Sequence, residues 1–136
     1  MLPQIRKNTK LPIIDLIEIT SNYVKENHHS IGLLSTSKTR QDRLYEKQLT
    51  ETKIIYPSED EQMQISEIII RIIHNKVTEE DRLFLNSIIQ SLIRQGVEKV
   101  LLACTDLGDV IKSNPNTVDS TDILIRAIVG LSKAVS

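Results

Sequence analysis

Lys99-Val100-Leu101-Leu102-Ala103-Cys104-Thr105-Asp106 is the stretch of sequence that predicts the fold. Its apolar run, from 100 to 103, is short enough to be a β-strand buried on both faces. The run stops at the only cysteine of the chain, and the two residues that follow are common at the start of a helix. A short helix over 107–111 would then end at the turn 114–116. The stretch therefore predicts a buried strand that passes directly into a helix.

The position of Cys104 at this junction allows two interpretations. Unpaired backbone N–H groups and the positive end of the helix dipole lie at a helix N-terminus, and this environment lowers the pKa of a thiol and favours the reactive thiolate. A free cysteine is, however, usually a small buried hydrophobic residue without chemical function. Position alone leaves both interpretations open.

The length and composition are those of one soluble globular domain. The chain has 136 residues, 40% of them hydrophobic, and a net charge of −1. We expect no nucleic-acid partner, because there is no basic excess and only 3% of the residues are aromatic. We also expect no membrane association, because the longest apolar run is only a few residues and the N-terminus lacks the apolar core of a signal peptide. The single cysteine excludes an internal disulfide and fits a reducing, cytoplasmic setting.

Four short apolar segments alternate with segments of helical periodicity. The predicted strands are 30–34, 53–56, 100–103 and 117–118. The predicted helices are 15–27, 40–49, 59–75, 79–95, 107–111 and a last helix capped by Ser120 or Thr121. Residues 1–10 resemble the tail of a helix, and 11–14 a strand or linker. Thr78 and Asp81 resemble a capping box, and Gly96 is a natural helix stop.

This alternation predicts a parallel sheet with right-handed crossovers, flanked by helices in three layers. Ligands of such sheets bind at the carboxyl ends of the strands. Those ends carry the hydroxyl-rich loop 35–39, the segment 104–106 and the segment 119–121, which together suit a small anionic ligand. The same residue types are also ordinary helix caps. A generic phosphate-binding or signalling module is disfavoured, because the chain has no glycine-rich loop.

No metal is expected. His28 and His29 are adjacent in a polar turn, and no third ligand lies at helical or hairpin spacing from them.

Three motifs resemble those of the aspartate/glutamate racemase family. Residues 31–39 (IGLLSTSKT), followed by Tyr45 and Leu49, are similar to its strand and hydroxyl loop. Residues 96–106 (GVEKVLLACTD) resemble its strand that ends in Cys-Thr-Glu, and 118–121 (VDST) resemble its closing Asp-Ser/Pro-Thr. Three more residues fall in the same order at similar spacing: Pro57, Gln62 and Lys76. The resemblance covers nearly the whole chain and fits the aspartate branch better than the glutamate branch.

The resemblance implies one half of a two-domain racemase fold and a cofactor-independent reaction. In this family two cysteines flank the α-carbon of the substrate, one removing a proton and the other delivering one. Cys104 resembles the second of these cysteines. By resemblance, Thr36, Ser37 and Thr39 would bind a substrate carboxylate and Lys76 would help to place the anionic substrate. Thr105 and Asp106 would shape the site around the thiol.

The chain departs from the family where the first cysteine should lie. Residues 1–27 resemble the end of the preceding half and its connecting helix, and 28–136 the C-terminal domain. Ala103 replaces the usual glycine, Asp106 the usual glutamate, and no second thiol is present. The chain would then be a truncated racemase, a subunit whose partner supplies the first half, or a one-cysteine relative with one-faced chemistry such as decarboxylation.

Two functions follow as hypotheses. The first is a racemase-like protein for a small acidic amino acid, with Cys104 as its acid/base. The second is an inactive ligand-binding or interaction domain that has lost the other half and its cysteine. A half of this fold should expose an apolar face, so we expect a homodimer or association with a missing N-terminal half.

Overall fold

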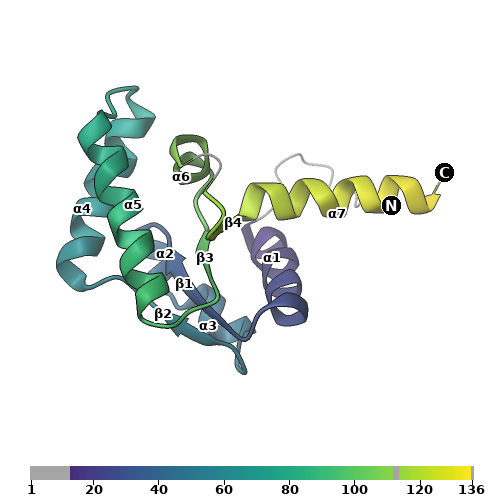
Figure 1. Ribbon diagram of the computed structural model, residues 1–136. Coiled ribbons are helices and arrows are strands. Elements are labelled where there is room, and N and C mark those ends of the chain that lie inside the picture. The colour runs from purple at the N-terminus through teal and green to yellow at the C-terminus, as the bar shows by residue number, and fades with distance from the viewer. Residues whose placement is uncertain (1–12, 112–113, 136) are drawn as a thin grey trace.

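The computed structural model describes residues 13–111 and 114–135, and its centre is a four-stranded parallel sheet (Figure 1). The strand order is β2-β1-β3-β4. Leu34 on β1 pairs with Leu102 on β3, and Leu102 pairs with Asp119 on β4. The four strands are β1 (Ser30–Leu34), β2 (Lys53–Ile55), β3 (Lys99–Leu102) and β4 (Thr117–Asp119). The predicted parallel α/β fold is confirmed, and all four strands lie where the sequence predicts them.

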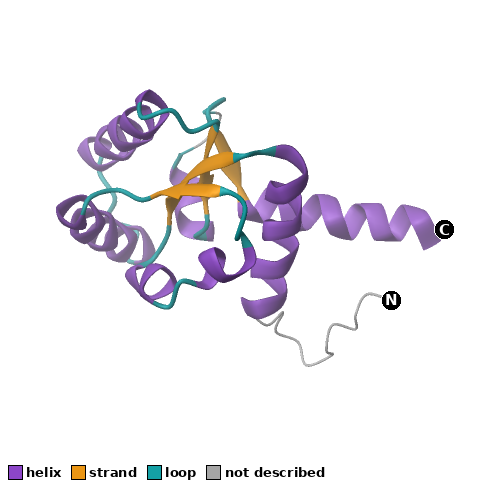
Figure 2. Ribbon diagram, turned by 90° about the horizontal axis from the view of Figure 1, so that it is seen from below, coloured by secondary structure: helices purple, strands orange, loops and turns teal. Residues whose placement is uncertain are grey.

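Helices cover both faces of the sheet, which gives the predicted three layers (Figure 2). Helices α4, α5 and α6 pack on one face, and α1, α3 and α7 on the other. Helix α7 projects beyond the body of the molecule (Figure 1). The helices are α1 (Ile13–Asn27), α2 (Ser37–Gln41), α3 (Leu44–Gln48), α4 (Glu59–Ile73), α5 (Glu79–Arg94), α6 (Thr105–Val110) and α7 (Ser120–Val135). None of the helices in the described ranges is long and apolar enough to cross a membrane.

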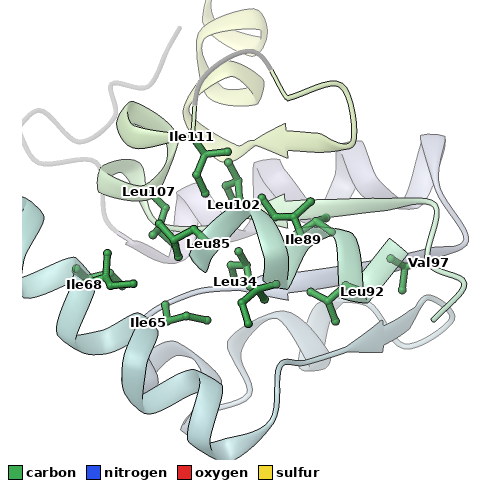
Figure 3. Packing of buried hydrophobic residues seen from close by; sticks show 13 residues of the cluster. Leu34, Ile65, Ile68, Leu85, Ile89, Leu92, Val97, Leu102, Leu107 and Ile111 are labelled. Carbon is green, nitrogen blue, oxygen red and sulfur yellow. The ribbon is translucent and has the colours of Figure 1, made fainter. Parts of the chain in front are cut away.

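Alternate residues of the two central strands supply the two apolar cores. Leu34, Val100 and Leu102 join the core formed with α4, α5 and α6 (Figure 3). Leu33 and Leu101 join the core formed with α1, α3 and α7. Because both faces of these strands are covered, their sequences are continuous apolar runs and not alternating ones.

Two capping boxes and one ion pair fix the hairpin of α4 and α5. Ser58 caps α4, and Thr78 caps α5 with Asp81 in the reciprocal position, as predicted. Asp81 also accepts two hydrogen bonds from Arg71 of α4, at 2.7 and 2.9 Å. After α5, Gly96 adopts a φ of 105°, which confirms it as the helix stop.

Three predicted boundaries are wrong. Helix α1 begins at Ile13, so 13–14 are neither strand nor linker, while the helix tail predicted for 1–10 lies outside the described residues. The single helix predicted over 40–49 is two helices, because Arg43 between them has a left-handed φ of 53°. Helix α2 begins at Ser37, so much of the predicted hydroxyl loop is helical.

Candidate functional site

The carboxyl ends of β1, β3 and β4 place the predicted loop and the cysteine side by side. The pairing of β1 with β3 continues past the strands, since the backbone N–H of Ala103 donates to the carbonyl oxygen of Leu34 at 2.9 Å. Thr36 and Cys104 each follow the paired residues Leu34 and Leu102 by two positions, and both have extended backbone. Side chains two residues apart share a face, and neighbouring strands lie about 4.8 Å apart. Thr36 and Cys104 are therefore neighbours on the face that carries α4, α5 and α6.

Hydrogen bonds to α4 hold the hydroxyl loop in place. Gln62 of α4 is buried and donates from Nε2 to the carbonyl oxygen of Ser35 at 3.0 Å. The hydroxyls of Ser37 and Ser66 share a hydrogen bond of 2.8 Å. Ser66 is a site residue that the sequence interpretation missed, because nothing in its helical periodicity indicates that it faces the loop.

Thr36 caps α2 and contacts Thr39. Its Oγ1 accepts from the backbone N–H of Thr39 at 3.3 Å and donates to Oγ1 of Thr39 at 3.1 Å. The two hydroxyls are half-buried at the end of β1. Thr36, Ser37 and Thr39 thus form one cluster of hydroxyls at the end of β1, and their role in binding a carboxylate stays a prediction.

The thiol of Cys104 lies at the N-terminus of α6 but is not activated by that position. Cys104 is half-buried and packs against the core under α4, α5 and α6. Burial raises the pKa of the Cys104 thiol, and the carboxylates of Asp106 and Asp119 raise it further. The backbone N–H groups of Asp106 and Leu107 lower this pKa by less than burial raises it. Of the two interpretations of Cys104, the direction of this shift favours the buried, unreactive thiol, because desolvation outweighs the helix N-terminus.

A hollow of about 530 Å³ opens at the other side of Cys104, between α6, β4 and the start of α7. Thr105, Asp119 and Thr121 are among the residues that line it. The carboxylate of Asp119 accepts a hydrogen bond from the backbone N–H of Thr121 at 2.9 Å, so Asp119 caps α7 in place of the predicted Ser120 or Thr121. Burial raises the pKa of Asp119.

Gly108 of α6 makes room for this carboxylate. A Cβ atom at position 108 would lie 2.0 Å from Oδ2 of Asp119 and 2.7 Å from its Cγ. A side chain at 108 would therefore displace the carboxylate from its place at the hollow. The sequence interpretation used Asp119 only as part of a motif and missed Gly108.

The remaining predicted residues lie at different distances from the thiol. Thr105 is exposed and lines the hollow, and Asp106 is close enough to raise the pKa of Cys104. Lys76 is exposed in the turn between α4 and α5, where its backbone N–H donates to the carbonyl oxygen of Arg71. Within the described ranges, its ammonium group forms no hydrogen bond or ion pair that would fix it at the rim. No group of three His, Cys, Asp or Glu residues among those described could hold a metal ion.

The family model described as "Asp/Glu/Hydantoin racemase" matches residues 1–128. The chain belongs to this racemase family. It is 28% identical over 133 residues to a protein of Pectobacterium carotovorum subsp. carotovorum described as "Uncharacterized protein in pnlA 3'region". That match covers 92% of this chain and 88% of the other.

Two solved structures share the fold of this racemase-family chain. One is an aspartate racemase homologue from Pyrococcus horikoshii OT3, with 21% identity, a TM-score of 0.73 and coverage of 96% of this chain and 60% of that one. The other is the Picrophilus torridus aspartate racemase, with 24% identity, a TM-score of 0.63 and coverage of 78% and 46%. The chain thus spans about half the length of these structures.

Proposed function

We propose that this chain binds a small acidic amino acid at the carboxyl ends of β1, β3 and β4, with Cys104 as an acid/base at the α-carbon. The observation that carries the proposal is the position of the only thiol in a racemase-family chain. It lies between the cluster of hydroxyls of Thr36, Ser37 and Thr39 and the hollow beside Asp119. The reaction would need no cofactor, and a free thiol suits the reducing cytoplasm.

The chemistry makes demands that these residues can meet. An α-proton is weakly acidic, so the base must be held in place and the developing negative charge must be stabilised by hydrogen-bond donors. The hydroxyls of Thr36 and Thr39 are donors next to the thiol, with Ser37 and Thr105 at the edges. Lys76 is an exposed cation on the turn that follows α4, where it would attract an anionic substrate.

A complete racemase needs a second acid on the opposite face of the α-carbon. Cys104 serves one face only, and the chain contains no other thiol. We therefore propose that the site is completed by a second α/β half, supplied by a second copy of this chain or by an N-terminal half. Exposed apolar side chains on α7 support this, since Ile125, Ile128 and Val129 are 52%, 43% and 44% exposed.

A second candidate function has one observation in its favour. Burial raises the pKa of the Cys104 thiol, and a thiol that is harder to ionise suits a ligand-binding domain without turnover. This alternative differs from the first in whether bound amino acid exchanges its α-proton.

Proton NMR of aspartate in D2O tests the proposal. The wild-type chain should replace the α-proton with deuterium, and Cys104→Ala should lose this exchange while it keeps its fold. Equal exchange rates in the two proteins would contradict the role of Cys104. Saturable binding of aspartate without exchange would favour the ligand-binding alternative.

A further inference from the structure

We propose that Asp119 holds the ammonium group of the amino acid whose α-carbon faces Cys104, and thereby sets the orientation of that amino acid. This inference rests on the proposed function and adds a positioning residue to it. It follows from the placement of three side chains on three adjacent strand ends.

Asp119 lies on the same face of the sheet as Cys104. Asp119 pairs with Leu102, whose side chain points into the core under α4, α5 and α6. Cys104 follows Leu102 by two residues and packs against the same core. Thr36, Cys104 and Asp119 therefore lie on one face of the sheet, at the ends of β1, β3 and β4 in that order. Two strand spacings span about 10 Å, which suits a small amino acid lying across Cys104.

The carboxylate of Asp119 has a hydrogen-bond donor but no cationic partner within the described ranges. Oδ1 of Asp119 accepts from Thr121, while Oδ2 rests against Gly108. Within the described ranges, no lysine or arginine forms an ion pair with Asp119. A half-buried carboxylate without a cationic partner is a suitable counter-ion for an ammonium group.

The hollow is negatively charged. The described residues that line it include three carboxylates and no basic side chain. Asp109 and Asp122 are exposed, whereas Asp119 is half-buried. Of these three carboxylates, Asp119 is the one whose charge raises the pKa of Cys104. The hollow thus repels a substrate carboxylate and attracts an ammonium group. The carboxylates of the amino acid would then bind to the hydroxyls of Thr36, Ser37 and Thr39 at the end of β1.

The arrangement also links binding to the state of the thiol. The negative charge of Asp119 raises the pKa of Cys104 when the hollow is empty. An ammonium group between them would offset this charge and favour the thiolate. Binding of the correct amino acid would then help to activate the base that acts on it.

Asp119→Asn tests the inference, because asparagine is as good a helix cap as aspartate and the substitution removes only the charge. The probes are L-aspartate and D-aspartate, which carry the ammonium group, and succinate, which lacks it. We expect Asp119→Asn to weaken aspartate binding by at least about tenfold, as for the loss of a charge-assisted contact, and not to weaken succinate binding, since succinate has no ammonium group to lose. Asp60→Asn, at an exposed position of α4 outside the hollow, is the matched control and should change neither.

A second readout needs no ligand. Alkylation of Cys104 by iodoacetamide should move to lower pH in Asp119→Asn and keep its pH dependence in Asp60→Asn. If Asp119→Asn fails to fold, Gly108→Ala displaces the carboxylate without removing it and should give the same loss of aspartate binding.

The outcomes separate this inference from the proposed function. Equal weakening of aspartate and succinate, or no weakening of aspartate, would overturn the role of Asp119 while binding by the wild-type chain still supports the function. Binding of neither aspartate nor succinate by the wild-type chain would overturn both.

Discussion

Gly108→Ala should weaken amino-acid binding at least about tenfold at almost no cost in stability. The new Cβ would lie 2.0 Å from Oδ2 of Asp119, and ordinary contacts begin at 3.4 Å, so the carboxylate must move by about 1.4 Å. The movement breaks its hydrogen bond to the N–H of Thr121, which costs about 1 kcal/mol as the loss of a helix cap. Alanine in place of glycine inside α6 stabilises the helix by about 1 kcal/mol. The two effects nearly cancel.

The assay pairs thermal unfolding with aspartate titration. Gly108→Ala should keep the unfolding midpoint within a few degrees of wild type and bind aspartate at least about tenfold more weakly. Gly96→Ala is the matched control: its φ of 105° makes it strained by about 1–2 kcal/mol, yet nothing lies near its Cβ position. It should therefore lose stability and keep binding. Unchanged aspartate affinity in a folded Gly108→Ala would refute the reasoning about Asp119.

Three further predictions concern stability, reactivity and assembly. The ion pair with Arg71 lowers the pKa of Asp81 to about 2. The contribution of this pair to stability is therefore present above the unfolded pKa of about 3.9 and is lost as the pH falls through 2. Asp81→Asn should lower the free energy of unfolding at pH 7 by about 1 kcal/mol, since Arg71 is partly exposed, and the difference from wild type should disappear at pH 2. Alkylation of Cys104 should titrate above the ordinary thiol pKa of about 8.5, and reaction as fast as that of a low-pKa thiol at pH 7 would contradict its burial. Ultracentrifugation at micromolar protein should show self-association that Ile128→Asp weakens, and a wild-type monomer would argue against a second copy on α7.

Much of the fold could be predicted because short local sequence patterns indicate its strands and helix starts. The apolar run before Cys104 is continuous, since β3 is covered on both faces, and the capping box at Thr78 sits immediately before α5. The parallel sheet then follows from the alternation of strands and helices. The resemblance singled out the loop at the end of β1, and the register of β1 and β3 brings the end of β1 next to the end of β3, where Cys104 follows.

What could not be predicted depends on contacts between distant parts of the chain. The break at Arg43 is a change of one backbone angle, which the helical periodicity of 40–49 does not reveal. The pKa of Cys104 depends on the helices packed above it, so its helix N-terminus, seen in the sequence alone, could not decide between a reactive and an unreactive thiol. The role of Gly108 appears only when the carboxylate of Asp119, on another element, is placed against it.

The most direct test of the central claim is the stereochemistry of α-proton exchange. D-aspartate and L-aspartate, each incubated in D2O with the wild-type chain at a dilution where it is monomeric, should differ: one enantiomer should lose its α-proton signal without inversion, because Cys104 serves one face. Addition of an N-terminal half, or association with a second copy of the chain, should then allow inversion. Exchange with inversion by the monomer, or exchange that survives Cys104→Ala, would contradict the account.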